Sequence, residues 1–192
     1  MKKLYKLMPS VYFDDYCLRT IKKSDAKDMF EYGKDPEVTQ FLNWGPFILP
    51  IEAKKSITTI FYPRLKEGLP RGYAIIDLKK SKMIGTIDFH SKINNVNGAE
   101  VGFVIHKDYW NQGIMSNALN RLIQIGFEYL GYDLIRIKHL KNNVASQKVI
   151  LKNGFKYIKS EMYILEKKDQ VLKDELLTYE LTREDYHVNQ QS

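Results

Sequence analysis

Residues 101–118 contain the side chains and spacing best suited to bind a phosphorylated ligand. An apolar strand over residues 101–105 leads into a short loop that contains Gly113, and a long helical pattern follows. A helix start presents backbone N–H groups without intrahelical partners, and the helix dipole adds positive potential. Gly113 has no side chain to obstruct an anion, and Ser116 is of a type that caps helices and donates to phosphate oxygens. We therefore expect an anion site at this turn.

Other phosphate-binding patterns do not fit this segment. Gly102 and Gly113 are too far apart for the glycine-rich turn of a dinucleotide fold, and the GxxxxGK[ST] pattern is absent from the chain. Helix starts with glycine and serine are common, and most of them bind no ligand. The segment by itself therefore does not identify the anion.

Two motifs together resemble the GNAT acetyltransferases, in the form found in the RimJ/RimL ribosomal-protein N-acetyltransferases. Tyr109-Trp110-Asn111-Gln112-Gly113-Ile114-Met115-Ser116-Asn117-Ala118 is similar to the family's Y-W-G-x-G-[YI]-[AM]-[ST]-E-A loop. Asn142-Asn143-Val144-Ala145-Ser146-Gln147-Lys148-Val149-Ile150-Leu151-Lys152-Asn153-Gly154-Phe155 is similar to N-x-A-S-x-[KR]-V-L-x-K-x-G-F. The resemblance extends over about residues 16–183, within one expected domain that spans residues 1–192.

The resemblance implies that acetyl-CoA is the cosubstrate and assigns residues to it. Backbone amides would hold the pyrophosphate at Gln112, Gly113, Ile114, Met115 and Ser116. The strand at Phe103, Val104 and Ile105 would pair with the peptide-like pantetheine arm. Asn143 would hydrogen-bond that arm, and Ser146 would lie near the thioester sulfur.

Three positions depart from the family pattern. Asn111 replaces the usual first glycine of the loop, Asn117 a common glutamate and Asn153 a common leucine. Asparagine adopts left-handed backbone conformations more readily than most residues do. We expect that neither Asn117 nor Asn153 abolishes cofactor binding.

We expect the reaction to be direct attack of a neutral amine on the acetyl thioester. At pH 7 an α-amine with a pKa of about 8 gives up its proton at a cost of ~1.4 kcal/mol, whereas a lysine at about 10.4 requires ~4.6 kcal/mol. A protein N-terminus therefore needs a weaker base than a lysine does. The resemblance favours such an N-terminus, with a ribosomal protein as one acceptor.

Glu100 and Ser146 are the candidate catalytic residues. Glu100 lies on the strand that would flank the pantetheine and shares a face with Gly102 and Val104, so it is placed to take a proton through a water. The alternative is an ordinary strand glutamate paired with a neighbouring lysine. Ser146 would hydrogen-bond the departing thiolate, and its alternative is a first-turn hydroxyl that caps its own helix.

Other reactive residue types carry weaker signals. His90 or His106 could assist as a base, although an exposed strand histidine is the plainer interpretation of each. The four histidines show no ligand spacing, so we expect no metal. Cys17 is interpreted as a small apolar strand residue. Trp44 and Phe47, in the aromatic segment 41–49, are candidates to line the acceptor cleft, with core packing as the alternative.

Both strands and helices are predicted along the chain, and together they must position these residues. Strands are predicted over residues 16–22, 72–79, 83–92, 99–106, 133–140, 155–165 and 175–182. Helices are predicted over residues 24–32, 50–61, 116–130 and 144–153. Short turns between the middle strands imply antiparallel neighbours. We expect an α/β (α+β) protein of the GNAT fold, with a central mixed, mostly antiparallel sheet of about seven strands flanked by about four helices.

Composition limits the class of protein. The 192 residues carry a formal charge of +7, with 44% hydrophobic residues and one cysteine, which is typical of a globular protein in a reducing compartment. No apolar stretch is long enough to span a membrane, and we expect a cytoplasmic protein. The basic charge favours an anionic cofactor or a ribosomal surface, and it equally serves solubility.

Other functions remain open at this level. The acceptor could be a small amine such as a polyamine or an aminoglycoside, which an acidic pocket would favour. A non-catalytic CoA-binding or nucleic-acid-binding module is the alternative outside the enzymes, although the lysines form no aromatic-interleaved stripe. The sequence does not determine the oligomeric state, although the resemblance leaves a homodimer open because dimers are common in the family.

Overall fold

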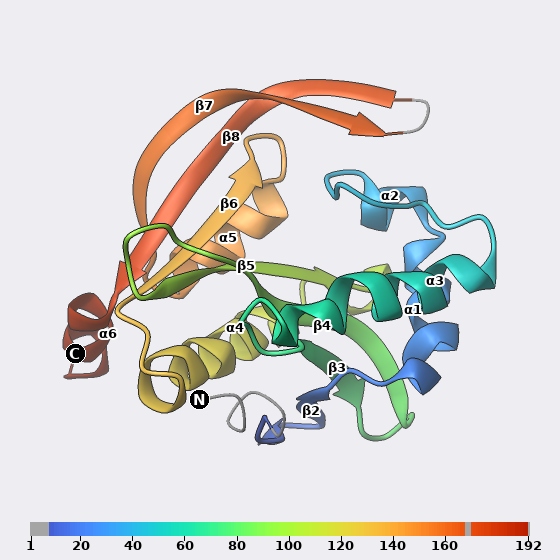
Figure 1. Ribbon diagram of the computed structural model, residues 1–192, viewed down its shortest axis with the longest axis horizontal. Helices are drawn as coiled ribbons and strands as arrows, with labels where there is room; N and C mark the ends of the chain where they lie inside the picture. The colour runs from blue at the N-terminus through green and yellow to red at the C-terminus, as the bar shows by residue number, and fades with distance from the viewer. Residues whose placement is uncertain (1–7, 168–169, 192) are drawn as a thin grey trace.

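The computed structural model describes residues 8–167 and 170–191, whose strands form an eight-stranded sheet (Figure 1). Across the sheet the strands follow the order β1-β2-β3-β4-β5-β6-β8-β7. Neighbouring strands are antiparallel except β5 and β6, which are parallel. The strands are β1 (Val11–Phe13), β2 (Tyr16–Thr20), β3 (Tyr73–Asp77), β4 (Lys82–Lys92), β5 (Gly98–Ile105), β6 (Leu134–Leu140), β7 (Lys156–Lys167) and β8 (Gln170–Thr182).

Six α-helices accompany the sheet in the described part of the chain. They are α1 (Ala26–Gly33), α2 (Pro36–Thr39), α3 (Pro50–Ser56), α4 (Ile114–Gln124), α5 (Val144–Lys152) and α6 (Arg183–Gln191). The expected mixed, mostly antiparallel sheet is confirmed, with one strand and two helices more than the sequence indicated. The additional β1 and α2 are too short to show a periodic pattern, and the additional α6 is mostly polar.

Two hydrophobic cores lie on opposite faces of the sheet. Adjacent strand residues alternate between them: Leu18 faces the core under α4 and α5, while Cys17 faces the core under α1 and α3. This alternation follows from the period of two in a strand. The sheet is therefore covered on both faces, and ligands reach it where neighbouring strands separate.

Strands β5 and β6 separate halfway along their length. Their parallel pairing runs from Gly98↔Leu134 to Val101↔Ile137 and goes no further, although β5 continues to Ile105 and β6 to Leu140. Figure 1 shows the two strands diverging beyond this point. The divergence opens the sheet and leaves one backbone edge of β5 without a strand partner past Val101.

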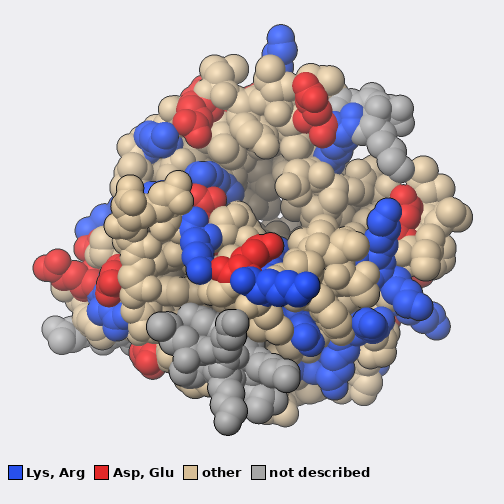
Figure 2. Space-filling model, in the orientation of Figure 1, with Lys and Arg blue, Asp and Glu red and all other residues tan. Residues whose placement is uncertain are grey.

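The long ribbon of β7 and β8 arches over the side of the sheet where these strands diverge (Figure 1). At its far end the Lys167 ammonium donates to the carbonyls of Thr39, the last residue of α2, and of Gln40 directly after it. Figure 2 shows a hollow near the centre of this face, with basic and acidic side chains interspersed around it. The ribbon and the loop after α2 thus close the space over the diverging strands.

Candidate active site

Two clefts of about 640 Å³ each meet where β5 and β6 diverge. We call the first the α4 cleft, since the start of α4 and the start of α5 line it. The second is the β4 cleft, which is lined by β4, by the loop after α2 and by the β7–β8 ribbon. The residues that line both clefts are Phe41, Leu42, Phe103, Val104, Asn143 and Ser146. A ligand in one cleft can therefore reach a ligand in the other.

The turn before α4 has the backbone conformation that an anion site requires. Asn111 and Gly113 have φ angles of 59° and 75°, both in the left-handed region. Asn111 thus adopts a left-handed conformation, which asparagine tolerates better than most residues do. A Cβ added at Gly113 would meet no other atom within 4 Å, so the space in front of it is open.

Helix α4 begins two residues earlier than predicted. Gly113 occupies the cap position and Ser116 is the third helical residue, so Ser116 does not cap the helix as the sequence suggested. Ile114, Met115 and Ser116 are buried and line the α4 cleft. Because glycine offers no capping side chain, the first-turn N–H groups remain free to meet an anion.

A hydrogen-bonded network anchors this turn to the sheet. The Tyr109 hydroxyl donates to Asp77 Oδ2 of β3 at 2.8 Å, and Lys80 Nζ donates to the same hydroxyl at 3.0 Å. Trp110 Nε1 donates to the Ile105 carbonyl at 3.0 Å. Burial acts to raise the pKa of Asp77. Hydrogen bonds from the Lys80 N–H and from the Tyr109 hydroxyl act in the opposite direction and keep that pKa below its ordinary value. The carboxylate therefore stays charged and holds the loop in place.

The start of α5 supplies the other polar residues shared by both clefts. Asn143 is the cap of α5, and its Oδ1 accepts from the Ser146 N–H at 3.2 Å. Ser146 is the third helical residue, so the capping role considered for it belongs to Asn143. Its hydroxyl has no hydrogen-bond partner among the described residues, and it lies where the two clefts meet.

The predicted cofactor residues come together in the α4 cleft. All of them except Gln112 line it: Phe103, Val104, Ile105, Gly113, Ile114, Met115, Ser116, Asn143 and Ser146. The Gln112 side chain instead donates to the Asp108 carbonyl at 2.8 Å, within the turn itself. The cofactor roles of these residues remain predictions.

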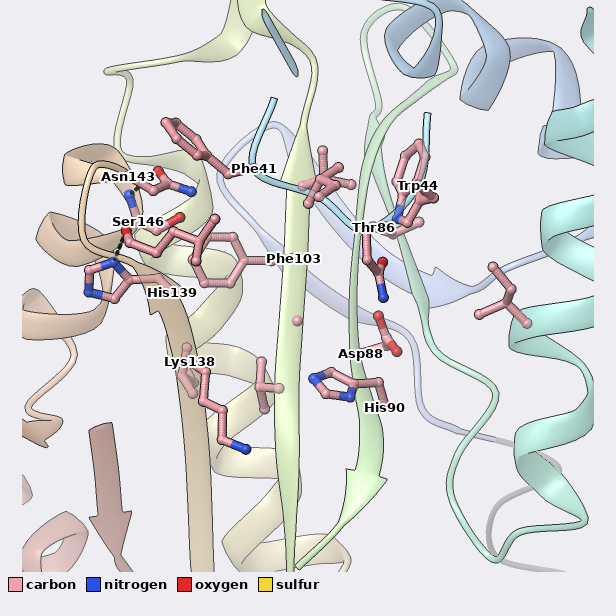
Figure 3. A pocket seen from close by; sticks show the side chains of 18 of the residues that line it. Phe41, Trp44, Thr86, Asp88, His90, Phe103, Lys138, His139, Asn143 and Ser146 are labelled. Atoms are coloured by element: carbon pink, nitrogen blue, oxygen red, sulfur yellow. Dashed lines mark hydrogen bonds between the residues drawn. The ribbon is translucent and has the colours of Figure 1, made fainter. Parts of the chain in front are cut away.

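The β4 cleft presents a row of polar side chains from alternate positions of one strand. Thr86, Asp88 and His90 project from β4 into it, as Figure 3 shows. Asp88 forms a buried ion pair with Arg64, and burial lowers the pKa of that guanidinium to about 10. Burial also lowers the pKa of His90, and the positive charge of Arg64 acts in the same direction. His90 is therefore neutral at pH 7.

Charges in the β4 cleft balance. Its cationic side chains are Arg64 and Lys138, and its carboxylates are Glu67 and Asp88. Since Arg64 pairs with Asp88, neither sign dominates the lining. This lining contrasts with the acidic pocket that a polycationic substrate would favour.

Glu100, the predicted base, is outside the lining of both clefts. Its Oε1 accepts from Lys138 Nζ at 2.9 Å and from Arg136 Nη1 at 3.4 Å, and its side chain is 15% exposed. This arrangement matches the alternative of a strand glutamate paired with a neighbouring lysine. A catalytic role for Glu100 stays a prediction.

The aromatic candidates divide between cleft and core. Trp44 lines the β4 cleft. Phe47 is buried, and its ring stacks on the Trp44 ring with 5.0 Å between the ring centroids. Several other lining residues were not predicted from the sequence, among them Phe41, Thr86, Asp88, Lys138 and Tyr163. The alternation along β4 could have indicated that Thr86 and Asp88 share a face with His90.

The remaining candidates lie away from both clefts. Cys17 is buried in β2, and burial raises the pKa of its thiol, so it is a poor nucleophile. His106 accepts from the Asp108 N–H at 3.1 Å in the turn after β5. Within residues 8–167 and 170–191 no group of three or more His, Cys, Asp or Glu side chains is placed to hold a metal ion. No helix of this part of the chain is long and apolar enough to cross a membrane.

Solved structures share this fold over nearly the whole chain. Ribosomal-protein-S5-alanine acetyltransferase from Vibrio fischeri matches with a TM-score of 0.75 and 21% identity, over 93% of this chain and 99% of that chain. Spermidine N-acetyltransferase from Vibrio cholerae, in complex with CoA and spermine, matches with a TM-score of 0.73 and 13% identity, over 90% and 98%. The chain therefore shares its fold with solved N-acetyltransferases.

Sequence comparison identifies the family. Residues 15–156 match the family model for the acetyltransferase (GNAT) domain. The chain is also 33% identical over 144 residues to the uncharacterized N-acetyltransferase p20 of Bacillus licheniformis, which covers 74% of this chain and 80% of the relative. The chain belongs to the GNAT acetyltransferase family, with a RimJ/RimL-like fold. It is an acyltransferase, and acetyl-CoA is its cosubstrate.

Proposed function

We propose that this enzyme transfers the acetyl group of acetyl-CoA to a protein N-terminal α-amine, of the ribosomal-protein type. The charge balance of the β4 cleft carries this proposal. Two cationic and two anionic side chains line it, and one of each is joined in the Arg64–Asp88 ion pair. Such a lining suits a peptide end with a single amine, while a polyamine or an aminoglycoside would leave several charges unpaired.

The ionisation of the acceptor supports the same choice. At pH 7 the neutral fraction of an α-amine exceeds that of a lysine side chain by roughly 200-fold, because their pKa values differ by about 2.4 units. Direct attack on the thioester needs the neutral form. The described part of the β4 cleft offers a neutral histidine and no unpaired cation beside it, which suits the weaker base that an α-amine requires.

In this proposal the two clefts divide the substrates between them. The α4 cleft takes acetyl-CoA, with its pyrophosphate on the first-turn amides after Gly113 and its pantetheine along the unpaired edge of β5. The β4 cleft takes the peptide. Ser146, which lines both clefts, donates a hydrogen bond to the sulfur as the thioester breaks.

A small-amine acceptor is the second candidate. The spermidine N-acetyltransferase of Vibrio cholerae has the same fold, and the β4 cleft of this chain is lined by Glu67, which has no place in the Arg64–Asp88 ion pair. This carboxylate could hold one distal ammonium of such a substrate. The proposal therefore needs a test that compares the two acceptor classes directly.

An acceptor screen that follows free thiol makes this comparison. Short peptides with a free N-terminus are compared with the same peptides blocked at the N-terminus but carrying an internal lysine, with spermidine and with an aminoglycoside. We expect thiol release with the free peptides and little with the others. Faster transfer to spermidine, or thiol release without any amine dependence, would contradict the proposal.

The setting of the reaction is also part of the proposal. We place the enzyme in the cytoplasm, where a free buried cysteine and a ribosomal-protein substrate are compatible with each other. The formal charge of +7 would favour encounter with the anionic ribosome. The homodimer that the resemblance leaves open can be tested by sedimentation of the purified protein.

A further inference from the structure

A β-bulge in β4 places one side chain of the β4 cleft in an unusual position. In the pairing of β4 with β5, Phe89 is opposite Val101 and Ser91 is opposite Glu100, so His90 is the extra residue between them. A bulge interrupts the ladder and redirects the side chain of the residue it inserts. Here it turns the His90 imidazole toward the place where β5 leaves β6.

Gly102 makes room for this ring on the neighbouring strand. A Cβ added at Gly102 would lie 3.1 Å from His90 Cδ2 and 3.7 Å from Nε2. Figure 3 shows the imidazole reaching from β4 toward β5, next to Asp88. Gly102 is the first residue of β5 beyond its last pairing with β6, and the next two residues line both clefts. The ring thus lies at the edge of the region where the two substrates meet.

A hydrogen bond orients the imidazole for proton transfer. His90 Nδ1 lies 2.8 Å from the Ser91 hydroxyl oxygen. With the proton on Nδ1 donated to Ser91, Nε2 carries the lone pair on the side of Gly102. A neutral histidine in this tautomer is a proton acceptor that needs no activating partner.

The charged groups around the ring keep it neutral. Burial has the largest effect and lowers the pKa of His90, Arg64 and Lys138 lower it further, and Glu100 raises it. Asp88, which projects from the same face of β4, is paired with Arg64. Glu67 is a further carboxylate in the lining of the cleft. Two cations thus face the imidazole, and one carboxylate opposes them.

We propose that His90 is the proton acceptor of the acetyl transfer and that Glu100 is a positioning residue, which holds Lys138 and adjusts the charge around the imidazole. The inference rests on the proposed transfer to an amine. The ammonium of the acceptor gives one proton to His90 Nε2, and its nitrogen then forms a bond to the acetyl carbon. As the carbon–sulfur bond breaks, a second nitrogen proton goes to the thiolate. His90 later releases its proton to solvent.

Other bases in the region are worse placed. Glu100 is held by Lys138 and Arg136 at 2.9 and 3.4 Å and lines neither cleft. His139 of β6 also lines the β4 cleft, but it is only 5% exposed, its Nδ1 lies 2.8 Å from the Leu140 carbonyl oxygen, and its ring stacks on Tyr179 at 5.3 Å between ring centroids. His90 alone of these three presents its ring on the same face as Thr86 and Asp88.

The test is the pH dependence of kcat, which reports ionisations in the enzyme–substrate complex. The wild type is compared with His90→Gln, with Glu100→Gln and with His187→Gln, an exposed control on α6. CoA affinity by calorimetry checks that each variant is folded. We expect the wild type to lose activity on the acid side at a pH below the ordinary histidine pKa, because burial lowers the pKa of His90. His90→Gln should lose on the order of 100-fold in kcat at neutral pH and should no longer show that acid loss.

Glu100→Gln separates the two candidate bases. Glu100 raises the pKa of His90, so removing its charge should lower that pKa. In Glu100→Gln we therefore expect kcat still to fall on the acid side, but at a lower pH than in the wild type. Disappearance of the acid loss in Glu100→Gln, or its persistence in His90→Gln, would overturn the inference.

A second readout distinguishes a chemical role of His90 from a structural one. A peptide that ends in an aminooxy group is neutral at these pH values and needs no base before attack. We expect it to recover most of the activity lost in His90→Gln, and an equal loss with both acceptors would overturn the inference. Absence of transfer to every amine is a different result, because it rejects the proposed function together with this inference.

Discussion

Gly113 combines two properties that the anion site needs. Its φ of 75° is one that residues with a side chain adopt at a cost, and the space in front of its Cα is open. Gly131 has a φ of 74° and equally open surroundings, but it lies after the helix and lines neither cleft. The two glycines therefore have the same backbone conformation, but only Gly113 lies where the ligand is expected.

This pair provides a controlled substitution. Gly113→Asp places a negative charge where the pyrophosphate is expected, and we predict that the Kd for CoA rises at least about 10-fold, equivalent to ~1.4 kcal/mol. Gly131→Asp carries the same backbone strain, roughly 1–2 kcal/mol, and should leave the Kd unchanged. Calorimetric titration of both variants checks this. Equal Kd values for the two variants would show that the turn does not hold the phosphates.

Ser146 is the hydroxyl that both substrates would reach. We predict that Ser146→Ala lowers kcat on the order of 10-fold, because one hydrogen bond to the developing thiolate is lost. CoA affinity should stay near the wild-type value, since the Asn143 cap accepts from the Ser146 backbone and survives the substitution. Steady-state kinetics with calorimetry separates the two effects. A loss of CoA affinity with unchanged kcat would assign Ser146 to binding.

At the scale of elements, the turn between β5 and α4 depends on β3. The Asp77 carboxylate, buried at the end of β3, accepts from the Tyr109 hydroxyl and from the Lys80 N–H. Its pKa is lowered in the folded state, so its contribution to stability is present above the unfolded pKa of about 3.9. That contribution is lost as the pH falls through the folded pKa.

A pH series of unfolding measurements tests this link. We predict that Asp77→Asn destabilises the protein by about 1–3 kcal/mol at pH 7, since the charged acceptor is lost, and that the difference from wild type shrinks below about pH 4. Asp15→Asn is the matched control, because Asp15 forms an exposed ion pair with Lys79 next to this turn. Urea unfolding from pH 7 to pH 3 gives both curves. If the difference in unfolding free energy between Asp77→Asn and the wild type stayed constant from pH 7 to pH 3, the ionised carboxylate would not be what stabilises the turn.

At the scale of the whole molecule, a bound cosubstrate would stabilise the region where β5 and β6 diverge. The ribbon end at Lys167 contacts the end of α2 and the residue after it, so parts of the chain far apart in sequence enclose this region. A ligand that binds the folded state alone raises its stability.

We predict that acetyl-CoA at 100 times its Kd stabilises the protein by about 2.7 kcal/mol. For a chain of this size, that corresponds to a rise in Tm of roughly 5–11 °C. Scanning calorimetry measures the shift, and Gly113→Asp at the same ligand concentration should show a smaller one. A wild-type Tm that does not respond to acetyl-CoA would contradict the assignment of the α4 cleft.

Local signals in the sequence were sufficient to predict the turn at Gly113 and the helices around it. A glycine that takes a left-handed conformation, an asparagine that tolerates one, and a helix start directly after them are properties of neighbouring residues. The strands of the middle of the chain were equally visible, since alternation is also local. The start of α4 was displaced by two residues because Gly113 and Ser116 are both acceptable caps, and packing of Ile114 and Met115 selects between them.

The tertiary structure decided which strand faces meet. Glu100 and His90 are both strand residues with plausible chemistry, and nothing local indicates that parallel pairing with β6 brings Lys138 and Arg136 onto Glu100. The bulge that turns His90 toward Gly102 is likewise a property of two paired strands. Sequence periodicity determines which residues share a face, whereas register and strand order, set by packing of the entire sheet, determine what that face contacts.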